Sequence, residues 1–208
     1  MTILSHRGYW KTLDERNIPL AFERSFKLGF GTETDLRDAG GKLVISHDPP
    51  GADALSFDAF LEIYNECGPG LPLALNVKAD GLQALAKAAL SRHGVTNYFF
   101  FDMSVPDALG YLKNDLTAFT RLSEYESAPS YLYEAKGVWA DMFLSDWIQE
   151  SDIAGFLAEG KQVCLVSPDL HKRPHAAFWE RVKGWSCVGN DALMLCTDLP
   201  EEAKEFFA

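Results

Sequence analysis

The sequence predicts an α/β fold of the (β/α)8 TIM-barrel class. Eight short runs, most of them apolar, alternate with segments whose apolar residues recur at helical spacing, a pattern typical of βα units around a parallel sheet. With 208 residues, of which 47% are hydrophobic, the chain has the length for one sizeable core, at the short end for eight βα units. No long Pro-, Gly- or Ser-rich tract marks a linker, so we expect a single domain over residues 1–208.

The eight runs predict eight strands. Each run is three to six residues long, as is common for buried strands of a parallel sheet. In chain order they are Ile3–Ser5, Gly31–Leu36, Leu73–Val77, Tyr98–Phe101, Thr117–Thr120, Val138–Phe143, Val163–Val166 and Leu193–Cys196. After the second run, the turn residues 38–41 and the apolar stretch 43–45 predict a hairpin extension of that strand.

Helical periodicity between the runs predicts helices that cover the sheet. In three segments the apolar residues share one helical face, which we expect to be buried. These faces consist of Ile18, Phe22 and Phe26; Leu82, Leu85, Ala86 and Leu90; and Phe178, Val182 and Trp185. The segment 127–137, SAPSYLYEAKG, has little amphipathic period, so its βα unit is the weakest of the eight.

Charge and composition argue against several classes of function. The formal net charge is -11 and the basic residues are scattered, which disfavours nucleic-acid binding. No segment reaches the roughly 20 apolar residues of a membrane span. The N-terminal MTILSHRGYW has neither a basic leader nor a cleavage site, so we expect a cytoplasmic protein. A small phosphorylated substrate stays compatible with the acidity, because a bound cation and a few local Arg or Lys residues can reverse the field in a cleft.

Polar residues gather at the carboxyl ends of the first predicted strands, where enzymes with this fold carry their active sites. They are His6-Arg7-Gly8 after the first strand, Glu33 and Asp35 on the second, His47-Asp48 after the hairpin, and Asn76 and Lys78 at the end of the third. This pattern brings two imidazoles, several carboxylates and two cations onto neighbouring strands.

Glu33 and Asp35 are two residues apart, so a strand directs both side chains to one face. Two carboxylates so close repel each other unless a cation compensates, and oxygen ligands suit Mg2+ or Ca2+. The pair alone also fits an exposed strand whose charges are solvated.

Taken singly, His6 and His47 fit a structural role as well as a catalytic one. Together, on either side of the carboxylate pair, they offer the base and the acid that phosphoryl displacement requires. Arg7 offers a planar, bidentate donor for a phosphate group, and Lys78 offers a point charge.

Several motifs resemble those of the glycerophosphodiester phosphodiesterase family. They are SHRG at 5–8, Asn17 with Ala21-Phe22, GTETD at 31–35, SHD at 46–48, and Cys196-Thr197-Asp198-Leu199-Pro200 near the end. The resemblance covers almost the whole chain, and its first fifty residues are the specific part. It implies a TIM-barrel enzyme of lipid metabolism that hydrolyses a glycerophosphodiester to glycerol 3-phosphate and an alcohol.

The resemblance also implies roles for single residues. It makes His6 and His47 the catalytic acid–base pair. The other roles it implies are phosphate contact for Arg7, a place facing the site for Lys78, and metal binding for Glu33 and Asp35.

Two features depart from the family pattern. Asn76 stands where the family has a glutamate ligand, and its amide oxygen can still coordinate a hard cation, but with one negative charge fewer and weaker binding. Asp102, after the fourth strand, could compensate, or could be a helix cap or a solvated loop charge. The loop Pro49–Ser56 is short where the family inserts a helical segment, so we expect a more open pocket.

Residues after the later strands extend the candidate site. Arg121, Trp147 and His171 are further candidates for phosphate or substrate binding, with a plain solvated loop as the alternative for His171. His171 and His175 have the i, i+4 spacing of a metal site, but Pro174 between them argues against a helix that presents both.

Three other functions stay open at this point. A phosphatidylinositol phospholipase C-like enzyme also uses two histidines on a barrel and can stop at a cyclic phosphate. A non-catalytic barrel could bind a phosphate ligand beside a metal site impaired at Asn76. A sugar-phosphate isomerase would not need the His-Arg-Gly and His-Asp motifs. The headgroup of the substrate, the choice between Mg2+ and Ca2+, and the oligomeric state are not predicted.

Overall fold

The computed structural model describes all residues, 1–208. Its strands are β1 (Thr2–His6), β2 (Gly31–Ala39), β3 (Lys42–Ile45), β4 (Leu73–Val77), β5 (Tyr98–Phe101), β6 (Phe119–Leu122), β7 (Gly137–Ala140), β8 (Gln162–Val166) and β9 (Leu193–Thr197). Its α-helices are α1 (Pro19–Lys27), α2 (Phe57–Cys67), α3 (Gln83–His93), α4 (Val105–Lys113), α5 (Glu150–Ala158), α6 (Ala176–Lys183) and α7 (Pro200–Phe206). Two short 3-10 helices are η1 (Leu13–Glu15) and η2 (Pro168–His171).

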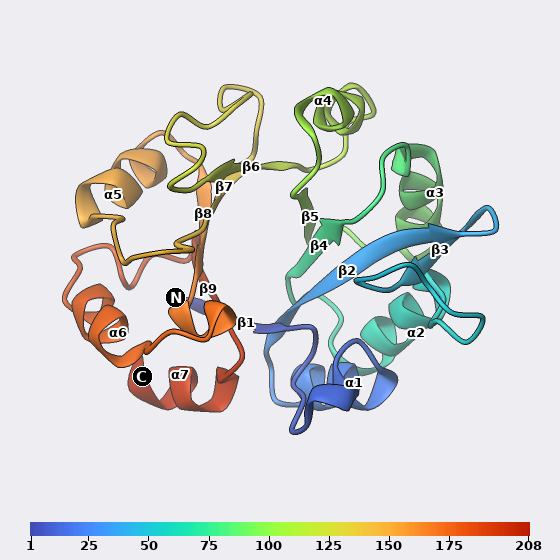
Figure 1. Ribbon diagram of the computed structural model, residues 1–208, viewed down its shortest axis with the longest axis horizontal. Helices are drawn as coiled ribbons and strands as arrows, with labels where there is room; N and C mark the ends of the chain where they lie inside the picture. Colours follow the sequence, from blue (N-terminus) through green and yellow to red (C-terminus); the bar gives the residue numbers. More distant parts are fainter. The chain divides into compact units, whose positions relative to one another are not determined.

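The fold is α/β, of the (β/α)8 class. Hydrogen-bonded neighbours follow the order β5-β4-β2-β1-β9-β8-β7-β6, and β3 pairs with β2 outside this path (Figure 1). The strand pairs from β2 through β4 to β5 and from β6 through β7 and β8 to β9 are parallel, whereas β3 is antiparallel to β2. An α-helix follows every strand of the parallel path except β6, which gives the alternation of a βα repeat.

The chain packs as two compact units. One unit comprises residues 5–118, and the other comprises residues 1–4 together with 119–208. The expectation of a single domain over residues 1–208 therefore stays a prediction. No α-helix has both the length and the apolar character needed to cross a membrane.

The strand predictions are confirmed at all eight positions. The predicted hairpin is also present, as β2 and β3, with Leu36 opposite Ile45. The fifth predicted strand is displaced, since β6 begins at Phe119 and not at Thr117. The sixth ends early, because β7 stops at Ala140 and the chain then turns into the loop that carries Asp141.

Two residues of the predicted helix faces are exposed. Ile18 precedes α1 as its N-cap and is 37% exposed, and Leu85 on α3 is 42% exposed. The other members of the three faces are buried. The predicted helical period is therefore confirmed, but the prediction that Ile18 and Leu85 are buried is wrong. The weak fifth unit has no α-helix at all between β6 and β7, as its poor amphipathic period indicates.

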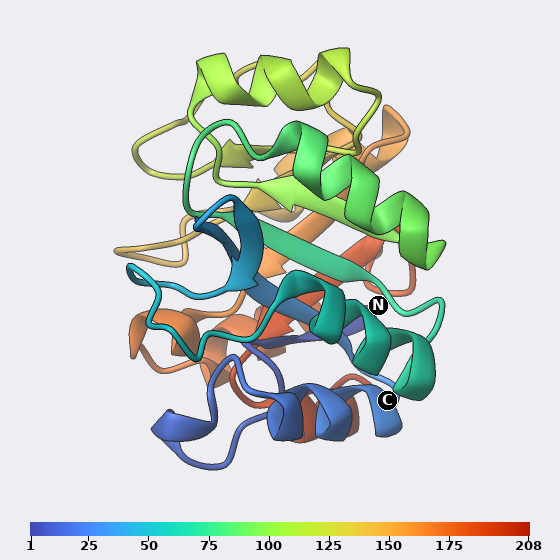
Figure 2. The same ribbon diagram turned by 90° about the vertical axis from the view of Figure 1, so that its right-hand side faces the viewer.

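Helices α1, α2 and α3 position the carboxyl ends of β2 and β4. Figure 2 shows the three helices side by side along these strands, and α2 contacts both of its neighbours. Phe22 of α1 and Phe60 of α2 are fully buried and meet edge to face, with ring centroids 4.7 Å apart. This apolar contact packs α1 against α2.

Candidate active site

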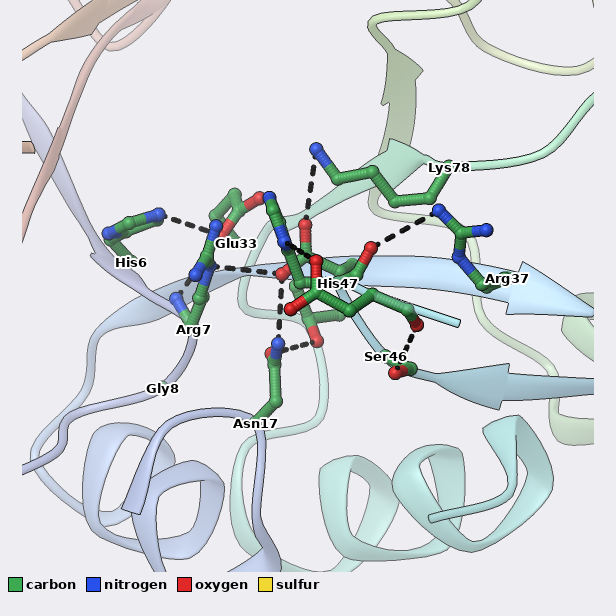
Figure 3. A network of polar contacts seen from close by, with 12 residues as sticks. His6, Arg7, Gly8, Asn17, Glu33, Arg37, Ser46, His47 and Lys78 are labelled. Atoms are coloured by element: carbon green, nitrogen blue, oxygen red, sulfur yellow. Dashed lines mark hydrogen bonds and ion pairs between the residues drawn. The ribbon is translucent and has the colours of Figure 1, made fainter. Parts of the chain in front are cut away.

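The polar cluster lies entirely within the unit formed by residues 5–118. Its side chains come from the carboxyl end of β1, from β2, from the loop after β3 and from the end of β4 (Figure 3). The structure brings together the predicted residues His6, Arg7, Glu33, Asp35 and Lys78 through hydrogen bonds and ion pairs.

The chain turns sharply after β1. Arg7 and Gly8 both have positive φ, at 59° and 78°, and a Cβ atom on Gly8 would lie 2.8 Å from the Cβ of Ala21. Only glycine fits this position without strain and collision. The turn is tied to β2, because the Arg7 amide donates to the Glu33 carbonyl at 2.9 Å and the Gly8 amide donates to Thr32 Oγ1 at 3.1 Å. His6 and Arg7 are thereby held over the acidic strand.

Glu33 is a buried carboxylate in contact with His6. Its side chain is 2% exposed, its Oε2 lies 3.9 Å from His6 Nε2, and it accepts a 3.2 Å hydrogen bond from the Arg7 amide. Burial, and after it repulsion from Asp35, raises the pKa of the Glu33 carboxyl to about 7. Glu33 can thus exchange a proton near neutral pH.

Asp35 is fully buried between two cations. Its Oδ2 lies 3.0 Å from Arg7 Nε and accepts a 2.8 Å hydrogen bond from the Asn17 amide, and its Oδ1 lies 3.3 Å from Lys78 Nζ. The side chains of Arg7 and Lys78 are 20% and 19% exposed, so each keeps a route to a ligand. Asp35 therefore holds two cationic side chains close to one point.

Asn17 is a positioning residue that the sequence reasoning did not assign to the site. Its φ is 59°, its Oδ1 accepts from Thr34 Oγ1 at 2.9 Å, and its backbone amide donates to the Arg7 carbonyl at 3.0 Å. Asparagine tolerates this left-handed backbone better than most residues. The only signal in the sequence was its place in the family-like motif, since its partners lie 17 and 18 residues away.

His47 lies on the loop after β3 and is the more accessible of the two histidines. Its side chain is 44% exposed, and its Nδ1 lies 3.0 Å from Asp48 Oδ1. Arg37 of β2 donates to the His47 carbonyl at 3.2 Å, which fixes the backbone of the loop. The free ring edge of His47 can therefore meet a ligand.

The oxygen atoms at this cluster fit a hard cation. Asp35 and Asn76 are register partners on β2 and β4, and the buried Oδ1 atom of each makes no hydrogen bond. With Glu33, they offer three oxygen-bearing side chains, of which two are acidic. No group of three or more His, Cys, Asp or Glu side chains suited to a metal occurs in the chain, so a site here depends on the amide. Asp102, the residue considered above as a replacement for the acid missing at Asn76, follows β5 with φ 66° and is half-buried.

A pocket of about 630 Å³ opens beside the cluster, within the size range of small-molecule sites. Arg7, Asn17 and His47 line it on the side of the cluster, and the short loop after β3 contributes residues 51 and 53–55. Arg16 also lines it, with its guanidinium 4.3 Å above the Trp10 ring. The pocket thus borders the short loop after β3, and the expectation that it is more open than in the family stays a prediction.

The three remaining candidates, Arg121, Trp147 and His171, belong to the other unit. Arg121 forms an ion pair with Glu126, and His171 Nε2 lies 2.6 Å from Asp141 Oδ1. Their substrate-binding role, like that of Trp147, stays a prediction.

His175 pairs with Glu202 at 3.0 Å, while His171 pairs with Asp141. Each histidine thus has a carboxylate partner of its own.

Comparisons with known proteins place the fold. No family model and no curated protein matches the sequence. A Galdieria sulphuraria protein assigned as a glycerophosphodiester phosphodiesterase is 18% identical, with a TM-score of 0.75 over 99% of this chain and 97% of that chain. A phosphodiesterase from Oleispira antarctica, in complex with the product sn-glycerol-3-phosphate, is 14% identical, with a TM-score of 0.72 over 99% and 96%. A Ca2+-dependent phosphatidylinositol-specific phospholipase C from Streptomyces antibioticus is 14% identical, with a TM-score of 0.58 over 100% and 96%. At these identities the likeness shows a shared fold.

Proposed function

We propose that this chain is a cytoplasmic, metal-dependent phosphodiesterase that hydrolyses a small glycerophosphodiester to glycerol 3-phosphate and an alcohol. The observation that carries the proposal is the arrangement around Asp35. Arg7 is held by Asp35 beside His6, and the same Arg7 lines one pocket with His47. The fold shared with glycerophosphodiester phosphodiesterases supports this substrate class.

In the proposed reaction, Arg7 and Lys78 bind the non-bridging oxygens of the phosphodiester. One imidazole of the pair His6 and His47 takes a proton from the attacking water as the new P–O bond forms. The other donates a proton to the alcohol oxygen as the old P–O bond breaks. Mg2+ or Ca2+ held by Glu33, Asp35 and Asn76 would supply charge stabilisation for the phosphoryl oxygens.

A second route uses a hydroxyl of the substrate as the nucleophile and gives a cyclic phosphate first. The fold shared with a phosphatidylinositol-specific phospholipase C favours keeping this route as the alternative. Phosphorus NMR of the first product separates the two, because a cyclic phosphodiester and a phosphomonoester have different chemical shifts.

The test is hydrolysis by the metal-stripped protein with Mg2+, Ca2+ or Mn2+ restored one at a time. An aryl phosphodiester and a glycerophosphodiester serve as substrates. We expect metal-dependent turnover that falls by about 10²- to 10⁴-fold in His6→Ala and in His47→Ala. The control is His93→Ala, which removes a histidine that pairs with Asp58. Unchanged rates in both site variants would refute the acid–base roles of His6 and His47. No turnover of either substrate with any metal would favour a non-catalytic phosphate-binding barrel.

A further inference from the structure

We propose that the metal ion and the phosphate group bind this site cooperatively, each weakly alone, because Asn76 leaves the cluster without a net negative charge. The inference rests on the proposed function for the identity of its ligands. It concerns how this particular set of residues holds them.

The charges of the cluster already balance before any cation arrives. With both carboxyls ionised, at the pH 8 of the test below, Glu33 and Asp35 carry two negative charges, and Arg7 and Lys78 carry two positive charges. Both cations lie against Asp35, at 3.0 and 3.3 Å, so its carboxylate is compensated. A divalent cation that enters therefore meets two positively charged side chains, and the cluster has no excess negative charge to attract it. Its binding to the free protein is weak.

Two buried oxygens nevertheless mark a place for a cation. Asp35 Oδ1 and Asn76 Oδ1 are buried without hydrogen bonds on register-paired positions of adjacent strands, and Asp35 Oδ1 has only the Lys78 ammonium at 3.3 Å. A buried oxygen without a donor, such as Asn76 Oδ1, is uncommon and costly. A hard cation would satisfy both, provided that another ligand supplies negative charge.

A phosphate group supplies the missing charge. Its oxygens can bind Arg7 and Lys78 and coordinate the cation at the same time, and a phosphomonoester brings two negative charges at pH 8. The cation in turn offsets the charge of the phosphate. Because coupling between two ligands is reciprocal, each must raise the affinity of the other by the same factor.

Calorimetry on the full-length, metal-stripped protein at pH 8 measures this factor. Mn2+ is titrated with and without saturating sn-glycerol 3-phosphate, and the reverse titration is done with and without Mn2+. A blank without protein corrects for binding of the two ligands to each other in solution. We expect each ligand to lower the Kd of the other at least tenfold. Equal Kd values within a factor of two, or tight Mn2+ binding without the phosphate, would overturn the inference.

Variants test the cause of the coupling. Asn76→Asp adds one negative charge, so Mn2+ should bind at least fivefold tighter without the phosphate and the coupling factor should shrink. Lys78→Gln removes one positive charge, so Mn2+ should again bind tighter without the phosphate. This variant provides the test if Asn76→Asp fails to fold. Asn190→Asp makes the same chemical change at an exposed position and should leave both Kd values unchanged. Coupling that persists undiminished in both site variants contradicts the assignment to the charge balance.

The two proposals fail in different ways. Hydrolysis with independent binding of Mn2+ and sn-glycerol 3-phosphate refutes the coupling and leaves the phosphodiesterase intact. Coupled binding without hydrolysis refutes the phosphodiesterase and leaves the coupling intact.

Discussion

Arg7 Nε lies 3.0 Å from Asp35 Oδ2, and this ion pair joins the turn after β1 to the buried strand β2. Asp35 is inaccessible to solvent, whereas the Arg7 side chain is 20% exposed. One end of the pair thus belongs to the core and the other borders the pocket. The same contact organises the site and stabilises the unit that carries it.

Asp35→Asn should destabilise the protein strongly for a substitution of equal size. The amide leaves Arg7 and Lys78 without their buried counter-charge, and the loss for a partly buried pair should be about 2–3 kcal/mol in the free energy of unfolding. Urea denaturation measures this loss. The matched control is Asp115→Asn, whose carboxylate is 95% exposed at 4.0 Å from Lys87 and should cost less than about 0.5 kcal/mol. Equal losses in the two variants would mean that the ion pair at Arg7 contributes no more than a surface charge.

Gly8→Ala should be more costly than the same substitution at Gly29. Both glycines have nearly the same positive φ, 78° and 81°. The new methyl group meets Ala21 at 2.8 Å in Gly8→Ala and nothing within 4 Å in Gly29→Ala. Gly29→Ala should lower the free energy of unfolding by about 1 kcal/mol through backbone strain alone. Gly8→Ala should lose a further 1–3 kcal/mol or so from overpacking. Similar losses by denaturant titration would show that the turn relaxes away from α1.

Strand positions and the alternation along them were predictable from the sequence. Short apolar runs define the sheet, and the period of two places Glu33 and Asp35 on one buried face. Because parallel strands end at one edge, the nearness of Arg7 and Lys78 to these carboxylates also followed from the pattern.

Contacts that depend on loop geometry were not predictable. The bridge from Asn17 to Thr34 and Asp35 requires the exact path of a loop with a left-handed residue, which periodicity does not encode. The exposure of Ile18 and Leu85 had a similar cause, since each lies at the edge of an apolar stripe where the neighbouring elements decide burial.

Asn17→Asp should destabilise the protein by about 2–3 kcal/mol. The change is isosteric, but it replaces the donor that reaches Asp35 Oδ2 at 2.8 Å by a carboxylate oxygen, so two like charges meet where a charge-assisted hydrogen bond was. Asn65→Asp is the control, because that exposed amide also donates one hydrogen bond, at 3.0 Å, but to the uncharged backbone carbonyl of His93. The control should lose less than about 1 kcal/mol. Thermal or urea unfolding that ranks the two variants in the opposite order would refute the role of Asn17 as a positioning residue.

Glu33 should make the metal-free protein less stable as the pH rises. Its pKa is raised from 4.5 to about 7 in the folded protein, first by burial and then by Asp35, so folding favours the protonated form. The stability that this proton contributes is fully present below pH 4.5 and is lost as the pH rises through 7. The loss amounts to at most about 3 kcal/mol, from the difference between the two pKa values.

Glu33→Gln isolates this effect, because the amide resembles the protonated acid and cannot ionise. Urea unfolding in the presence of a chelator at pH 5, 6, 7 and 8 gives the free energy of unfolding of both proteins. The difference between them should be small at pH 5 and should grow in favour of the variant up to pH 8. Parallel curves would mean that Glu33 is ionised throughout this range, with Arg7 and Lys78 compensating its burial as well as that of Asp35.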